Sequence, residues 1–166
     1  MGTMFFANPV AAFRNIHGAL APGGRLCMVV WRRKDENPAF FRAEQVVEGF
    51  VEHPDPNESD EPTCGPGPFS MANPDTVSAQ LLAAGFDEIT FRRADFATIG
   101  GRDMDEAVAL LMGLGPAGEV IRLAGDDAAR LSEEISAGIR EMLSEYERED
   151  GVFTPTSTWI VSAARA

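Results

Sequence analysis

The sequence contains few cysteines and few histidines, and this shortage excludes two kinds of structural framework. There are two of each in 166 residues. A disulfide-stabilised fold needs more cysteines, and a structural zinc site needs Cys and His clustered at short spacing. Cys27 lies in an apolar run and Cys64 in a Pro/Gly-rich stretch, and neither His17 nor His53 is close to them. We therefore expect no disulfide framework and no metal site.

Basic residues and long apolar runs are also scarce. There are 14 Lys and Arg against 26 Asp and Glu, a formal net charge of −12, and the only basic block is Arg32-Arg33-Lys34. Nucleic acids and acidic membranes would be repelled, and the acidity is more simply a means of keeping the protein soluble. No apolar run is long enough to span a membrane, and no signal peptide is recognisable at the N-terminus. We therefore expect a cytoplasmic protein without nucleic-acid or membrane partners.

What the sequence does have is an alternation of helix and strand patterns. Asn8-Pro9 is typical of a helix start, apolar residues follow at spacings of three and four, and Pro22-Gly23-Gly24 ends the pattern. The next run, "RLCMVVW" at residues 25–31, is apolar almost throughout. Such a run predicts a strand that is buried on both faces, as in a parallel sheet covered by helices.

The rest of the chain continues this alternation. Helices are expected at residues 38–51, 74–84, 102–112 and 128–147, and strands at 87–96 and around Trp159-Ile160-Val161. On the second of these helices, Val77, Leu81 and Leu82 are expected on the buried face. The "GLGPAG" segment, residues 113–118, is expected to be a loop. This order predicts a single α/β domain over residues 1–166, with helices covering a small sheet.

One long segment has a different composition. Residues 52–69 carry many of the prolines and acidic residues of the chain. Such a segment cannot bury much surface, so we expect an exposed loop that serves as a lid or is an insertion.

Several quoted segments, taken in order, carry a resemblance to a known family. They are "FFANPVAAFRNIHGALAPGGRLCMVVWR" (residues 5–32), "NPDTVSAQLLAAGFDEITF" (73–91) and "GVFTPTSTWIVSAARA" (151–166). Together they resemble the C-terminal half of class I S-adenosylmethionine-dependent methyltransferases, most closely those of the ubiquinone/menaquinone-biosynthesis type. The resemblance implies a partial Rossmann-like sheet made of the family's fifth, sixth and antiparallel seventh strands, with covering helices and an inserted helical segment.

The cofactor-binding motif of that family is missing from this chain. The family holds S-adenosylmethionine with a glycine-rich loop after its first strand and an acidic residue after its second, because backbone approach needs Gly and a carboxylate accepts from ribose hydroxyls. Here the glycine-rich "CGPGP" (residues 64–68) and "GLGPAG" do not follow strands and are interpreted as loops. By comparison with the family, the first three strands and most of the fourth are absent.

Four residues are candidates for ligand contact by the same resemblance. Met4 and Phe5 follow the expected fourth strand and are assigned to the cofactor, and Phe6 and Trp31 are assigned to the substrate. The alternatives are that Phe5 and Phe6 pack against the first helix and that Trp31 belongs to the core. No catalytic residue is assigned: His17 reads more simply as a surface residue, and Asp35 and Glu36 as loop acids.

The resemblance implies a methyltransferase that transfers a methyl group to a small apolar acceptor once a cofactor-binding half completes it. The alternative is an inactive fragment that acts as a homo-oligomerising or binding module. A homodimer is expected in that case, because a sheet without neighbours has a bare edge at residues 26–31 that recruits other strands. A third hypothesis is a small-molecule carrier with a Phe-rich binding site.

Overall fold

A computed structural model describes residues 1–51 and 66–166 of the chain. Most of the expected exposed loop, together with His53 and Cys64, lies outside the described residues. The chain divides into two compact units. Unit 1 contains residues 1–36, 66–95 and 157–166, and unit 2 contains residues 37–51 and 96–156. The division falls within two strands that contribute to both units, and the single domain expected from the sequence stays a prediction.

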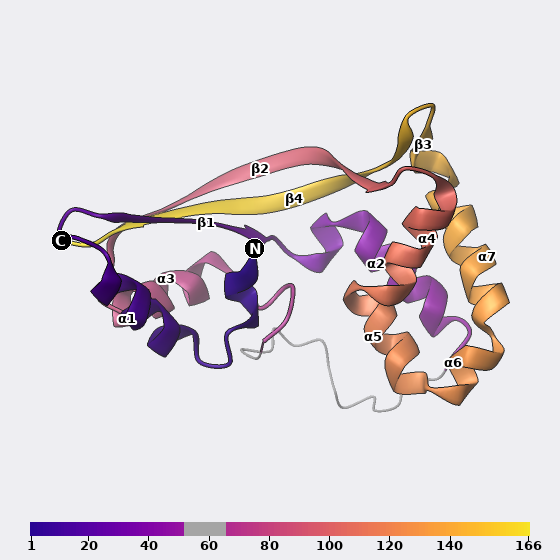
Figure 1. The fold of residues 1–166 in the computed structure, drawn as a ribbon, viewed down its shortest axis with the longest axis horizontal. Coiled ribbons are helices and arrows are strands. Elements are labelled where there is room, and N and C mark those ends of the chain that lie inside the picture. Colours follow the sequence, from indigo (N-terminus) through magenta and orange to yellow (C-terminus); the bar gives the residue numbers. More distant parts are fainter. Residues whose placement is uncertain (52–65) are drawn as a thin grey trace. The chain divides into compact units, whose positions relative to one another are not determined.

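Unit 1 combines a sheet with two α-helices (Figure 1). Its elements are η1 (Gly2–Phe5), α1 (Pro9–Ala19), β1 (Arg25–Trp31), η2 (Lys34–Glu36), α3 (Pro74–Ala83) and the adjoining parts of β2 (Asp87–Gly101) and β4 (Gly151–Ala164). The start of α1 is as predicted, because the Asn8 side chain accepts a hydrogen bond from the Ala11 N–H at 3.0 Å. Asn73 caps α3 in the same manner.

The sheet has the strand order β1-β4-β2, so the last strand of the chain lies between two earlier ones. β1 and β4 are antiparallel, with a register that runs from Arg25 opposite Ala164 to Trp31 opposite Thr158. The short strand β3 (Glu147–Arg148) pairs with β4, also antiparallel. The chain is therefore a mixture of helices and an open sheet with antiparallel pairing.

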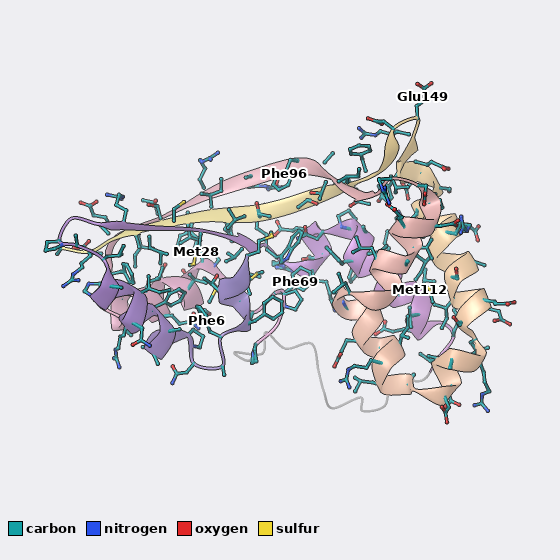
Figure 2. The ribbon with its side chains drawn as sticks, viewed as in Figure 1. Phe6, Met28, Phe69, Phe96, Met112 and Glu149 are labelled. Atoms are coloured by element: carbon teal, nitrogen blue, oxygen red, sulfur yellow. The ribbon has the colours of Figure 1, made fainter. Side chains whose placement is uncertain are left out.

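The prediction that β1 is buried on both faces is wrong. Met28 and Val30 are buried on the face that packs against α1 and α3, whereas Cys27 on the opposite face is exposed. Figure 2 shows Met28 and Phe6 on the helix side of the sheet. The physical reason is that, within the described part of unit 1, no helix covers the other face and β1 is the terminal strand of the sheet. An apolar run alone does not distinguish these cases.

The core of unit 1 explains two further features of the sequence. The buried side of α3 is formed by Val77 and Leu81, four residues apart, whereas Leu82 is 61% exposed. The prediction that Leu82 is buried is therefore wrong, because the next residue on a helix points about 100° away from its neighbour. On β2, Ile89 and Phe91 pack against the core and alternate with exposed residues, as expected.

Unit 2 consists mainly of helices. They are α2 (Pro38–Glu48), α4 (Met104–Gly113), α5 (Gly115–Ala124), α6 (Asp126–Arg130), α7 (Ser132–Leu143) and η3 (Ser144–Tyr146). Within the described ranges no single helix is long and apolar enough to cross a membrane, and α4 and α5 pass the same test only as a pair bent by 62°.

Two predictions about unit 2 are wrong in detail. The "GLGPAG" segment is not a loop, because α5 begins at Gly115 directly after the end of α4. The single helix expected at residues 128–147 is instead α6, α7 and η3. Leu131 interrupts it: its backbone leaves the helical region (φ −104°, ψ 14°), and its side chain packs partly buried against the core of unit 2.

Candidate functional site

Two of the four candidate residues, Met4 and Trp31, meet at the carboxyl end of β1 in unit 1. Met4 has 2% of its surface exposed, and its Sδ accepts a hydrogen bond from the Trp31 N–H at 3.5 Å. The Met4 carbonyl accepts hydrogen bonds from Ser70 Oγ at 2.7 Å and from the Gly67 N–H at 3.0 Å. These bonds fix η1 against the end of β1 and against the residues that precede α3.

The aromatic candidates have different surroundings. The partly buried ring of Trp31 lies 6.5 Å from the ring of Phe69, with the planes inclined by 50°. Phe6 packs edge to face against the buried Phe13 at 6.1 Å, and Phe5 is 56% exposed. The structure thus brings Met4 to Trp31 and places Phe6 against the core and Phe5 in solvent. The ligand roles of all four residues stay predictions.

Arg32, the residue after β1, has a side chain that several contacts hold in place. Its side chain is 11% exposed, and its guanidinium lies 4.5 Å from the centre of the Trp159 ring. One terminal nitrogen donates to Ser157 Oγ at 3.1 Å, and the other donates to the Glu36 carboxylate. The Arg32 N–H also donates to the Ser157 carbonyl at 3.1 Å. The direction of this guanidinium is therefore set by contacts from both β4 and η2.

A second layer of polar contacts supports Arg32. Ser157 Oγ donates to Asp95 Oδ1 at 2.6 Å, and Arg93 Nε donates to the other oxygen of the same carboxylate at 2.7 Å. The Arg93 hydrogen bond, followed by that of Ser157, lowers the pKa of Asp95 below its usual value. Asp95 is therefore ionised at neutral pH, and its charge lies 3.9 Å from Arg32.

Trp159 has two further contacts besides that with Arg32. Its indole N–H donates to the Ala72 carbonyl at 3.1 Å, and its ring meets that of Phe91 edge to face at 6.0 Å. Because Trp159 lies opposite Val30 in the β1–β4 register, the pairing of the two strands places its ring beside the end of β1.

This arrangement places aromatic surface beside fixed charges at the end of β1. Trp31 and Phe69 supply ring surface for a planar apolar molecule, and the Arg32 guanidinium lies over one face of the Trp159 ring. The carboxylates of Glu36 and Asp95 are already hydrogen-bonded to arginines. The site is consequently suited to binding and positioning a molecule rather than to accepting a proton from it.

The start of α4 does not fit S-adenosylmethionine. Gly100 and Gly101 are the last residues of β2, shortly before α4 begins at Met104. A side chain on Gly101 would clash with the Ala107 nitrogen, so this glycine serves close packing of the protein against itself. Acidic groups already occupy the start of α4: Asp103 accepts from the Glu106 N–H, and Glu106 accepts from Arg102. A cofactor that presents a carboxylate to this helix start would meet like charge. Within residues 1–51 and 66–166, three or more Asp, Glu, Cys or His side chains do not gather into a metal site either.

Sequence reasoning missed the network of Arg32, Trp159, Ser157 and Asp95. The four residues are dispersed along the sequence, and they meet only through the pairing of β4 with its neighbours. One signal was present: Arg32 directly follows a predicted strand, as a ligand-contacting residue does. His17 lies elsewhere, with its ring edge to face against Phe86 at 5.0 Å. Asp35 binds Arg33 on the surface.

Comparisons with known proteins give a weak structural likeness. No protein-family model and no curated protein sequence matches this chain. Among solved structures, it is similar to a provisionally assigned methyltransferase from Bacillus halodurans C-125, with 14% sequence identity and a TM-score of 0.42. The match covers 99% of this chain and 66% of that protein, so the chain spans just under two thirds of its length. A likeness at this level does not by itself establish a fold or an activity.

Proposed function

We propose that this chain is the acceptor-binding part of a class I S-adenosylmethionine-dependent methyltransferase of the ubiquinone/menaquinone-biosynthesis type. It holds a small apolar methyl acceptor, and a cofactor-binding half supplies the methyl donor. In this proposal β1, β2 and β4 are the fifth, sixth and antiparallel seventh strands of a partial Rossmann-like sheet. The donor is held mainly by that half, because the glycine-rich loop and the acidic residue that hold it in the family are missing from this chain, and Met4 and Phe5 are assigned to contact it from this side.

The observation that carries the proposal is the contact between η1 and the end of β1. The resemblance assigns η1 to the segment after the fourth strand and Trp31 to the end of the fifth. Met4 Sδ and the Trp31 N–H are 3.5 Å apart, so the two segments do meet at one strand end. The antiparallel pairing of β4 with β1 is a second point of agreement.

We assign binding of the methyl acceptor to the aromatic rings of this region and to the guanidinium of Arg32. Trp31 and Phe69 provide apolar surface, and Trp159 is fixed by its bond to Ala72 and by Arg32. Because the reaction depends mainly on alignment of the acceptor with the donor, a site that positions a planar molecule rigidly contributes to the rate without acting as a base.

The two tryptophans of the chain, Trp31 and Trp159, allow a direct test because both belong to the site. Their indole N–H signals are followed by NMR during titration with 2-naphthol, a planar apolar phenol, and separately with S-adenosylhomocysteine. We expect a saturable shift of the Trp31 signal with 2-naphthol, because its ring is partly exposed. We expect no saturable shift with S-adenosylhomocysteine.

The control variants separate binding at the site from non-specific adsorption. Trp31→Ala should weaken the binding of 2-naphthol at least tenfold, as read from the Trp159 signal, because it removes a stacking surface. Phe96→Ala removes an exposed ring from unit 2 and should leave the affinity unchanged. Equal loss in the two variants would refute the proposed acceptor site. Micromolar binding of S-adenosylhomocysteine would refute the proposal that the cofactor site lies elsewhere.

A further inference from the structure

Within the described residues the chain passes from one unit to the other at three places. Unit 1 ends at Glu36 and again at Asp95, and it resumes at Ser157. A fourth passage falls between residues 51 and 66, outside the described part of the chain. Glu36 ends η2, Asp95 lies in β2 and Ser157 lies in β4, so the three described passages belong to three different elements of unit 1.

One side chain contacts the residue of unit 1 at each of these three passages. The Arg32 guanidinium donates to the Glu36 carboxylate through one terminal nitrogen and to Ser157 Oγ, at 3.1 Å, through the other. The second nitrogen also lies 3.9 Å from Asp95 Oδ1, which accepts from Ser157 Oγ at 2.6 Å. A guanidinium carries five N–H donors in a rigid planar arrangement, so one arginine can bind several acceptors at once.

Arg32 is itself held by the sheet of unit 1. Its backbone N–H donates to the Ser157 carbonyl at 3.1 Å, and its guanidinium lies 4.5 Å from the centre of the Trp159 ring. The indole N–H of Trp159 donates to the Ala72 carbonyl at 3.1 Å, which fixes that ring. The Arg32 side chain is only 11% exposed, so solvent and salt screen its charged hydrogen bonds weakly.

The bound position of Arg32 also carries a cost. Its Nε is buried and, within residues 1–51 and 66–166, has no hydrogen-bond partner. Buried donors are nearly always paired, because an unpaired one loses its bond to water without a replacement. If the side chain turned outward, Nε would regain water, whereas Glu36 and Ser157 would lose the guanidinium. These opposing terms allow an exchange between a bound and a released arginine.

We propose that Arg32 is a clamp that fastens the three described passages to unit 1 and releases them together. With the arginine bound, Glu36, Asp95 and Ser157 are restrained at one point. With the arginine turned outward, the three segments gain freedom at the same time. Because each of these segments continues into unit 2, release loosens every described connection between the units, as at a hinge. This proposal goes beyond the proposed function and does not depend on it.

Amide hydrogen exchange of the full chain tests the clamp in Arg32→Met, which keeps most of the length of the side chain and removes its donors. We expect exchange to rise at all three passages. The rise should be at least tenfold at residues 36–37, which lie outside the sheet. It should be about threefold at residues 95–96 and 156–157, because the pairing of β2 with β4 still restrains them.

The centre of the sheet shows whether Arg32 acts on the passages or on the stability of unit 1 as a whole. Met28 and Val161 lie opposite each other on β1 and β4, and both are buried. Their amide exchange should be the same in Arg32→Met and in the unchanged protein. A clamp moves only the passages, whereas a merely structural arginine would move these amides as well.

Three further variants serve as controls. Arg33→Met applies the same substitution to the neighbouring arginine, whose exposed side chain binds Asp35, and should leave all three passages unchanged. Glu36→Gln removes one charged partner and should raise exchange at residues 36–37 alone. Arg32→Lys keeps the charge on a single nitrogen that cannot bind all three partners, so it should restore only part of the protection that Arg32→Met loses.

Three results would overturn the proposal. They are a rise confined to one passage in Arg32→Met, equal effects of Arg33→Met and Arg32→Met, and a uniform rise that includes Met28 and Val161. If Arg32→Met does not fold, Arg32→Lys provides the same comparison: it must raise exchange at all three passages and leave the centre of the sheet unchanged.

Discussion

The two units of the molecule are built from side chains of different size. The core of unit 1 contains buried Phe13, Phe86, Met4 and Met71, with both tryptophans packed against it. The core of unit 2 contains aliphatic residues, several of them alanines, and its described buried members include no aromatic ring. Unit 1 packs helices against a sheet, and unit 2 packs helices against one another.

Glycine accounts for part of this difference. In unit 2, a side chain on Gly138 would lie 2.8 Å from Val46 Cγ1, and one on Gly115 would lie 2.9 Å from the ring of Phe40. The helices of unit 2 therefore approach one another where side chains are missing. The comparison indicates that unit 1 is sensitive to loss of volume and unit 2 to gain of volume.

The largest effect is expected from Phe13→Ala in unit 1. Phe13 is fully buried, so its removal should lower the free energy of unfolding by about 3–5 kcal/mol. Denaturant titration followed by tryptophan fluorescence reports on unit 1, since both tryptophans lie there. Phe96→Ala, which removes an exposed ring, is the control. A loss below about 1 kcal/mol would contradict a core of tightly packed large side chains.

Gly115→Ala should produce the next largest effect, in unit 2. Gly115 has a φ of +76° and lies against Phe40, so a methyl group there meets both backbone strain and a clash. We expect a loss of about 1–3 kcal/mol, measured by circular dichroism in denaturant.

Gly113→Ala is the matched control for this substitution. A methyl group on Gly113 meets nothing within 4 Å, and this residue ends α4. It should be neutral or slightly stabilising, because alanine has the higher helix propensity. If both substitutions destabilise equally, close helix packing is not what distinguishes unit 2.

The helix caps should show where the two units are alike. Asn8 caps α1 in unit 1 and Asp103 caps α4 in unit 2, each with one side-chain acceptor to a backbone N–H. Asn8→Ala and Asp103→Ala should each cost about 1 kcal/mol in denaturant titrations. Asn8→Ser and Asp103→Ser should restore most of the loss, which distinguishes capping from other roles of the two side chains. A cost confined to one unit would contradict the equivalence of the caps.

The smallest effect concerns pH and arises in unit 2. The Arg102 side chain, together with its backbone N–H, lowers the pKa of Glu106 from 4.5 to about 2. Because the pKa is lower in the folded state, the ionised Glu106 stabilises unit 2 above pH 4.5, and this contribution is lost as the pH falls toward 2.

Thermal unfolding of the protein and of Glu106→Gln at several pH values measures this contribution. The difference between the two midpoints should be present at pH 6 and should vanish near pH 2. It should also shrink at high salt, because both side chains are solvent-exposed. A difference that is independent of pH would refute the assignment.

The sequence predicts the type of most elements well, because the signals are local. The Asn-Pro starts of α1 and α3 and the glycine turn before β1 involve neighbouring residues only. The sequence does not predict structural features that depend on residues far away along the chain. Nothing in residues 25–31 indicates that helices cover only one face of β1, and nothing near residue 131 indicates the break between α6 and α7.

The candidate site shows the same limit. Met4 and Trp31 were proposed from the resemblance, and the structure brings these two together. Arg32 follows the strand, but its partners Ser157 and Trp159 lie on the last strand of the chain. Periodicity along one segment cannot specify which residues of another segment lie opposite it, and that information resides in strand register.

The position of β4 between β1 and β2 has a consequence for the time course of folding. β1 ends at Trp31, whereas β4, its only strand neighbour within the described residues, begins at Gly151, so β1 leaves the ribosome well before β4. Until β4 has been synthesised, β1 has two open sides instead of one. Pairings this distant in sequence also form slowly, because a long loop must close first. During that interval the unpaired edges of β1 are exposed, and a chaperone can bind them before β4 does.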